Sequence, residues 1–152
     1  MALPIVVPDA SVILKWVLPS ADEADAAQAL LLRTAIAQER VRALVPSLWL
    51  YEVGNTVSRR FPAQAAQWLA ALMKFGLEEA PPTERWVTAT LDLIARYGGT
   101  YYDAAYHAVA LVHGGVFVTS DLQYIERTRK NGAITSLAHW QPPAAHPKQR
   151  GR

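Results

Sequence analysis

The strongest constraint on the fold of this chain is a series of short apolar runs separated by longer segments typical of helices. The runs at residues 5–7, 41–45 and 116–119 are the length of strands, and the segments between them are long enough for helices. Short apolar strands that alternate with helices are typical of a parallel sheet covered on both faces. The sequence therefore predicts an α/β fold.

Turn and capping signals give approximate bounds for the elements. Strands are predicted at residues 5–7, 41–45, 77–80, 116–119 and 133–137. Helices are predicted at residues 20–40, 47–60, 63–75, 83–97, 100–113 and 121–130. The first of these helices is expected to begin at a capping box, Ser20-Ala21-Asp22-Glu23, directly after Pro19.

Acidic residues stand beside apolar runs at Asp9, Glu52, Asp103 and Asp121. A carboxylate is rarely buried unless it is paired with a positive charge or bound to a cation. Asp9 and Asp121 each follow a predicted strand, and ligands of open α/β sheets bind beyond the carboxyl ends of the strands. We therefore expect these two residues at one rim of the sheet, and we interpret all four as a candidate metal site.

Divalent metal chemistry would explain why such acids gather. Two carboxylates about 4 Å apart repel by roughly 4 kcal/mol at an effective dielectric constant of about 20, so converging carboxylates either protonate or bind cations. Mg²⁺ and Mn²⁺ prefer oxygen ligands and keep several waters. The chemistry that this pattern predicts is metal-assisted hydrolysis.

Each acid also has a purely structural explanation. Asp9 and Asp121 could cap the segments that follow their strands, Asp103 matches a capping box with Thr100, and Glu52 could be a solvent-facing helix residue. A shared site explains all four positions at once, so we favour it over four separate coincidences.

Composition narrows the class of protein. The 152 residues, 51% of them hydrophobic, suit one domain with a single core, which we place at residues 1–140. The absence of cysteine excludes disulfides, zinc–thiolate sites and a cysteine nucleophile. The net charge of +2 comes from a Pro-rich tail, residues 141–152, because the rest holds 12 basic and 13 acidic residues. We expect a cytoplasmic protein with no signal peptide or membrane span and a flexible tail.

Four stretches resemble a known family. Residues 6–12, 46–55, 102–110 and 117–121 read VVPDASV, PSLWLYEVGN, YDAAYHAVA and FVTSD. In this order and spacing, which covers residues 5–137, the chain resembles PIN-domain ribonucleases, specifically the VapC-type toxins of bacterial and archaeal toxin–antitoxin pairs. Any one stretch is a weak signal, whereas all four in order are a strong one.

The resemblance implies roles for the residues at matching positions. It implies that Asp9, Glu52, Asp103 and Asp121 are the catalytic acids and the ligands of Mg²⁺ or Mn²⁺. Groups that orient these ligands or bind water are implied at Ser11, Asn55, Thr119 and Ser120. The family fold is a parallel sheet of about five strands between helices, an α/β/α sandwich.

The resemblance also implies an activity and partners. The activity is that of a metal-dependent endoribonuclease that hydrolyses RNA phosphodiester bonds. The partners are the RNA substrate, a cognate antitoxin protein whose C-terminal segment lies across the acidic cleft, and a second copy of the chain. Residues 47–75 are the expected homodimer face.

Basic and aromatic residues near the acids are candidates for RNA contact. Arg59, Arg127 and Arg129 follow the acids on their helices, and arginine binds phosphate whatever the base sequence. Basic residues near helix C-termini also complement the helix dipole, which is the alternative role. Tyr102 and Tyr106 could stack on an unpaired base or pack in the core.

His107 departs from the family pattern, which has an apolar residue there. It lies one helical turn after Asp103, so it could reach a metal ion or a phosphate group, or it could be a packed imidazole. The second reading is the one we favour.

Two other classes of protein share parts of this pattern. A phosphatase with an aspartyl nucleophile needs a second aspartate two residues after the first, where this chain has Ser11. A non-catalytic PIN-like module that binds nucleic acid or protein remains the alternative to an enzyme.

Overall fold

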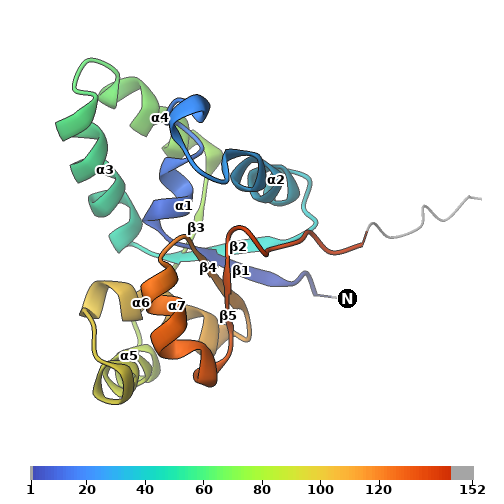
Figure 1. Ribbon diagram of the computed structural model, residues 1–152, viewed down its shortest axis with the longest axis vertical. Coiled ribbons are helices and arrows are strands. Elements are labelled where there is room, and N and C mark those ends of the chain that lie inside the picture. Colours follow the sequence, from blue (N-terminus) through green and yellow to red (C-terminus); the bar gives the residue numbers. More distant parts are fainter. Residues whose placement is uncertain (1, 145–152) are drawn as a thin grey trace, which may run out of the picture.

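The centre of the molecule is a sheet of parallel strands (Figure 1). A computed structural model describes residues 2–144. The five strands lie in the order β3-β2-β1-β4-β5, and each neighbouring pair is parallel. Their bounds are Ile5–Pro8 (β1), Arg42–Pro46 (β2), Glu78–Ala80 (β3), Val116–Thr119 (β4) and Ile134–Ser136 (β5). The predicted α/β class is confirmed.

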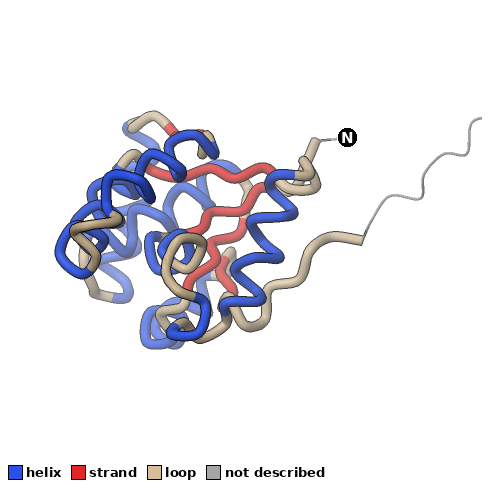
Figure 2. The backbone as a smooth tube through the Cα atoms, turned by 90° about the horizontal axis from the view of Figure 1, so that it is seen from above, coloured by secondary structure: helices blue, strands red, loops and turns tan. Residues whose placement is uncertain are grey.

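Helices cover both faces of this sheet. The α-helices are Ala10–Leu14 (α1), Ala26–Ala37 (α2), Leu48–Arg60 (α3), Ala65–Phe75 (α4), Glu84–Tyr97 (α5), Tyr101–His113 (α6) and Leu122–Thr128 (α7). Short 3₁₀ helices lie at Ser20–Asp22 (η1) and Arg129–Asn131 (η2). Helices α1 to α4 lie on one side of the sheet and α5 to α7 on the other (Figure 1), and the view from above shows the strands enclosed between them (Figure 2).

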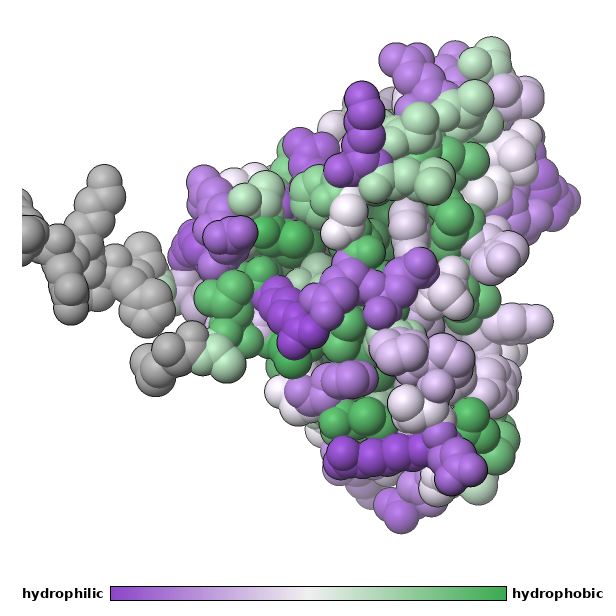
Figure 3. Space-filling model, turned by 180° about the vertical axis from the view of Figure 1, so that it is seen from behind, coloured by the Kyte–Doolittle hydropathy of each residue, from purple (hydrophilic) through white to green (hydrophobic). Residues whose placement is uncertain are grey.

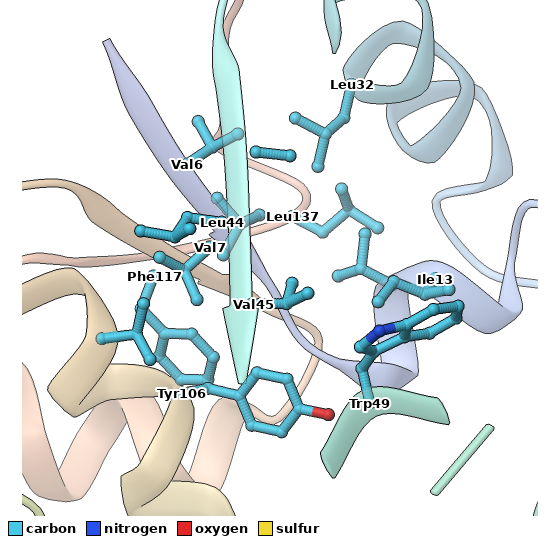
Figure 4. Close-up of a cluster of buried hydrophobic side chains, with 14 of the residues drawn as sticks. Val6, Val7, Ile13, Leu32, Leu44, Val45, Trp49, Tyr106, Phe117 and Leu137 are labelled. Atoms are coloured by element: carbon cyan, nitrogen blue, oxygen red, sulfur yellow. The ribbon is translucent and has the colours of Figure 1, made fainter. Parts of the chain in front are cut away.

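The main core lies where the central strands meet the helices (Figure 4). Val7, Val45 and Val118 are completely buried because β1, β2 and β4 are covered on both faces. Burial of a valine or leucine side chain contributes about 1.5–3 kcal/mol relative to exposure. The continuous apolar runs noted in the sequence are therefore the part of the chain that holds the sheet between its two helical layers.

The prediction that a long helix begins at Ser20 is wrong. Residues 20–22 form a 3₁₀ turn, and α2 begins at Ala26. The capping box does not form because Glu23 is engaged elsewhere, in an ion pair with Lys15 at 3.2 Å. Asp25 then adopts a left-handed conformation with φ of 57°, which separates the 3₁₀ turn from α2.

The strand order creates a topological switch point at the carboxyl end of the sheet. The chain passes from β1 outward to β2 and β3, and later returns to place β4 on the other side of β1. The order therefore reverses between β1 and β4, and such a switch point is where ligands bind in open α/β sheets. Pro8 at the end of β1 is in register with Val118 of β4, so Asp9 follows one strand and Asp121 the other at this switch point.

Two further predictions concern the absence of a membrane span and a separate C-terminal tail. Within residues 2–144, no helix is both long and apolar enough to cross a membrane. Most of the predicted tail, residues 141–152, lies outside the described residues, so its separation from the domain stays a prediction. Inside the described part, the Arg40 side chain donates a hydrogen bond to the Pro143 carbonyl.

Candidate active site

Asp9 is held at the end of β1 by several hydrogen bonds to its carboxylate. Its Oδ1 accepts from the Ser11 hydroxyl at 2.5 Å and from the backbone N–H of Val12 at 3.2 Å, which makes Asp9 the N-cap of α1. Its Oδ2 accepts from the Thr119 hydroxyl at 2.5 Å. Both oxygens are therefore oriented by groups from β4 and from the start of α1.

Burial makes the charge on Asp9 costly. It raises the pKa of the Asp9 carboxyl to about 6, against the opposing effect of the bonds from Ser11, Thr119 and Val12. The negative charge of Glu52 raises the same pKa further. The charge of Glu52 therefore acts on the Asp9 carboxyl, although the two residues lie on different elements.

Glu52 reaches the same region from the second turn of α3. Its Oε1 accepts a hydrogen bond of 2.7 Å from the hydroxyl of Tyr106 on α6. Burial raises the pKa of Glu52, and the charge of Asp103 adds to this effect. Tyr106 is 2% exposed and stacks on Phe117, so it is a fixed donor. Figure 4 shows its hydroxyl turned toward the start of α3, where Trp49 lies.

Asp103 and Asp121 complete the group from the opposite side of the sheet. Asp103 lies in the first turn of α6, where its N–H donates to the Thr100 side chain. Asp121 is the N-cap of α7 and accepts from the N–H of Tyr124 at 3.0 Å. After burial, the charge of Asp103 and to a smaller extent that of Asp121 raise the pKa of the Tyr124 hydroxyl, so both acids lie within electrostatic reach of it.

Thr119 connects the two strand-end acids. Its Oγ1 donates to Asp9 and accepts the backbone N–H of Asp121 at 3.0 Å. The Ser11 hydroxyl likewise donates to Asp9, and it accepts a hydrogen bond from the backbone N–H of Ser120 at 3.3 Å. These bonds tie the start of α1 to the start of α7 across the switch point.

The four acids have no cationic partner in the part of the chain that the structure describes, because its ion pairs all involve other acids. Over the same residues, no group of three or more acidic or histidine side chains is arranged to hold a metal ion. Hydroxyl and backbone donors stabilise Asp9, Glu52 and Asp121 instead. The structure thus brings the four acids to one end of the sheet without closing them around a common point.

Ser120 and Asn55, which were also predicted to belong to the site, differ in their burial. The Ser120 hydroxyl is buried and has no hydrogen-bond partner among the described residues, next to Asp121. Asn55 is exposed and lines a surface hollow of about 380 Å³ with Thr56, Arg59 and Arg60. Asn55 therefore lies three residues after Glu52 on α3, and among the described residues it makes no hydrogen bond to an acid of the site.

The three predicted RNA-binding arginines differ in their surroundings. Arg129 is paired with Glu126 at 2.6 Å. Arg127 is exposed and lies over the Tyr124 ring at 5.8 Å, with its guanidinium against Gly99, which adopts φ of 90°. Arg59 is exposed beside Asn55. Arg59 and Arg127 are therefore better suited to meet a phosphate than Arg129.

His107 is a packed imidazole, as favoured from the sequence. It is fully buried and makes two hydrogen bonds of 2.9 Å, with the Tyr124 hydroxyl and with the Gly132 carbonyl. A carbonyl only accepts, so Nε2 carries the proton and Nδ1 accepts from Tyr124. Burial lowers the pKa of His107, which keeps the ring neutral. Neither ring nitrogen is free for a metal ion or a phosphate.

Comparison with known proteins places this arrangement in a family. The model of the PIN domain family matches residues 6–131, which contain all four acids. The chain belongs to the PIN-domain family. It is 31% identical over 104 residues to Exonuclease VapC9 of Pyrobaculum aerophilum, an overlap that covers 64% of this PIN-domain chain and 74% of the relative.

Solved structures agree with this PIN-domain fold. The crystal structure of PAE2754 from Pyrobaculum aerophilum superposes with a TM-score of 0.62 at 23% identity, over 91% of this chain and 93% of that one. VapC20 of Mycobacterium tuberculosis, described as a Sarcin-Ricin loop cleaving toxin, superposes with a TM-score of 0.55 at 18% identity, over 72% and 84%. At these identities the likeness establishes the fold, a five-stranded parallel sheet flanked by helices.

One contact in the PIN-domain site was missed from the sequence. Tyr106 was considered for base stacking or core packing but not as the hydrogen-bond donor to Glu52. A signal was present, because Tyr106 is three residues after Asp103 and so shares its helix face. An acid and a hydroxyl on one face of α6 imply that this face looks toward the site.

Proposed function

We propose that this PIN-domain protein is a metal-dependent endoribonuclease that hydrolyses RNA phosphodiester bonds, and the toxin of a VapBC-type toxin–antitoxin pair. The observation that carries the proposal is that Asp9 and Asp121 follow β1 and β4 at the switch point of the sheet, with the charge of Glu52 acting on Asp9 and that of Asp103 acting on Glu52. The negative charges of these acids raise the pKa values of Asp9, Glu52 and the nearby Tyr124 hydroxyl. Among the described residues, no lysine or arginine forms an ion pair with any of the four acids.

The donor set fits Mg²⁺ or Mn²⁺. It consists of carboxylate oxygens, which these ions prefer. Asp9, Glu52, Asp103 and Asp121 would hold the ion. A bound divalent ion lowers the pKa of water and neutralises charge on a phosphate group.

The chain's own residues have separate tasks in this proposal. Ser11 and Thr119 orient the Asp9 carboxylate, and Tyr106 orients that of Glu52. Arg59 and Arg127, on the two sides of the acids, attract the RNA backbone and offset the repulsion between phosphates and carboxylates. The acids need no protein nucleophile beside them, which agrees with the absence of cysteine.

The names of the relatives support an RNA-cleaving toxin. VapC20 is named as a toxin that cleaves the Sarcin-Ricin loop, and VapC9 as an exonuclease. By analogy, the proposed partners are RNA, a cognate antitoxin that covers the acidic cleft and a second copy bound through residues 47–75. The proposed location is the cytoplasm.

The test is cleavage of RNA with Mg²⁺ or Mn²⁺ and with EDTA, by the wild type and by Asp9→Asn. A circular RNA distinguishes the two modes of attack, because an exonuclease has no end from which to start. Linearisation of the circle by the wild type alone supports an endoribonuclease, and degradation of linear RNA alone points to an exonuclease. Equal cleavage by both proteins reveals a contaminating nuclease and contradicts the proposal.

The alternative is a non-catalytic PIN-like binding module. It predicts that RNA stays intact with either ion and that expression leaves growth unaffected. An active toxin instead arrests growth on expression of the wild type, and Asp9→Asn relieves the arrest.

A further inference from the structure

Two tyrosines on one face of α6 have opposite environments. Tyr102 and Tyr106 are four residues apart, so they project from the helix about 40° from each other. Tyr106 is 2% exposed, whereas Tyr102 is 59% exposed. This face of α6 is therefore buried at Tyr106 and exposed to solvent one turn nearer the N-terminus, at Tyr102.

The bond from Tyr106 to Glu52 shows where this face points. It crosses from α6 to α3, since the Tyr106 hydroxyl lies 2.7 Å from the Glu52 carboxylate. Tyr102 lies one turn nearer the N-terminus of α6, and helical side chains tilt in that direction. Tyr102 therefore lies on the face of α6 that reaches Glu52, one turn nearer the N-terminus and beside Asp103. The outline of the molecular surface is indented along one edge (Figure 3).

Among the residues described, the Tyr102 ring lacks the specific contacts that its neighbour Tyr101 makes. The adjacent Tyr101 packs edge-on against Trp86, with ring centroids 5.9 Å apart. Tyr102, in contrast, has neither an aromatic partner nor a side-chain hydrogen bond among the residues described. An exposed aromatic ring alone needs no explanation, but this one stands next to an acid of the site.

We propose that Tyr102 stacks on an unpaired base of the RNA, next to the phosphate that meets the acidic residues. This inference rests on the proposed function. The carboxylates repel phosphates but not the neutral faces of bases. An aromatic ring beside them can therefore bind the strand by stacking on one of its bases. Bases of an A-form duplex are stacked inside the helix and out of reach of a side chain. Tyr102 would thus favour looped or single-stranded segments.

Fluorescence of 2-aminopurine tests the stacking directly, because stacking on an aromatic ring quenches this base. The probe is a short unpaired RNA with one 2-aminopurine, bound to the Asp9→Asn protein so that cleavage does not interfere. In this background we compare Tyr102, Tyr102→Phe and Tyr102→Ala. We expect quenching with Tyr102 and Tyr102→Phe, and loss of quenching with about tenfold weaker binding for Tyr102→Ala.

Tyr51→Ala is the matched control. Tyr51 is 76% exposed and also directly precedes an acid, Glu52. It lies two residues before the buried Val53, about 200° around α3, so it points away from the protein. We expect this variant to keep both the quenching and the affinity.

The outcomes separate this inference from the proposed function. Unchanged quenching in Tyr102→Ala, or equal loss in Tyr51→Ala, overturns the role of Tyr102 even if the wild type cleaves RNA. Quenching that depends on Tyr102 supports the role even if cleavage is absent, and the proposed hydrolysis then fails alone. Because Tyr102 is exposed, its replacement should leave the fold intact. The thermal unfolding temperature of each variant checks that it is folded.

Discussion

The Thr119 hydroxyl donates a 2.5 Å hydrogen bond to the Asp9 carboxylate, 110 residues away in the chain. The same hydroxyl accepts the N–H of Asp121, so one side chain fixes both acids at the ends of β1 and β4. The bond belongs to the class of charge-assisted hydrogen bonds, which are about twice as strong as neutral ones. Thr119 is therefore the link through which the switch point holds the geometry of the acids.

Replacement of Thr119 by valine keeps the shape of this side chain but removes both bonds. We expect affinity for Mn²⁺, measured by titration calorimetry, to fall about 10-fold, since loss of a group that orients a metal ligand typically costs 10–100-fold. Thr90→Val is the control, because Thr90 is equally buried but donates only to the Trp86 carbonyl of its own helix. Equal affinities for the two variants would contradict an orienting role for Thr119.

The raised pKa of Asp9 predicts how stability depends on pH without metal. Between about pH 4 and pH 6 the folded state binds more protons at Asp9 than the unfolded state, so this group's contribution to stability falls as pH rises. The full effect is about 3 kcal/mol at most, because Asp9 keeps some exposure to solvent. Denaturant unfolding in EDTA should therefore show Asp9→Asn gaining stability relative to the wild type from pH 4 to pH 7. A pH-independent difference would show that burial of this charge is not costly.

A divalent ion should reverse that penalty. An ion that binds only the folded state at 100 times its dissociation constant contributes about 2.7 kcal/mol. We expect Mn²⁺ at pH 7.5 to raise the unfolding temperature of the wild type by several degrees and to leave Asp9→Asn nearly unchanged. EDTA should remove the increase, and an equal rise in both proteins would place the ion elsewhere.

His107 should matter for stability and not for chemistry. His107→Leu leaves the Gly132 carbonyl and the Tyr124 hydroxyl without their partners, at about 1–3 kcal/mol for each buried group. We expect a lower free energy of unfolding and normal RNA cleavage per folded molecule. Lost cleavage in a variant that unfolds at the wild-type denaturant concentration would instead assign His107 to the reaction.

Arg127 and Arg129 form a natural pair for testing RNA contact. Arg127→Ala should weaken RNA binding several-fold and reduce the slope of log affinity against log salt by about 1, because one phosphate contact is lost. Arg129→Ala should change the slope less, since Arg129 is already paired with Glu126. Identical slopes for both variants and the wild type would remove Arg127 from the RNA-binding surface.

Local patterns predicted most of the helices and strands of this protein. The helix after Pro82 begins where expected, with Thr83 as its cap, and the apolar runs became β1, β2 and β4. The prediction failed where a distant group intervened, at Ser20, because Glu23 pairs with Lys15. The short helix α1 was not predicted, although Asp9 was considered as a cap for the segment that follows its strand.

The sequence by itself determined the layered α/β class and the positions of the acids along the chain, because periodicity and capping act over a few residues. Only the tertiary structure decided which groups meet at the site. The strand order puts β4 beside β1, which brings Thr119 to Asp9, and helix packing on opposite faces brings Tyr106 to Glu52 across 54 positions. Such contacts depend on how the whole core packs, and no local pattern specifies them.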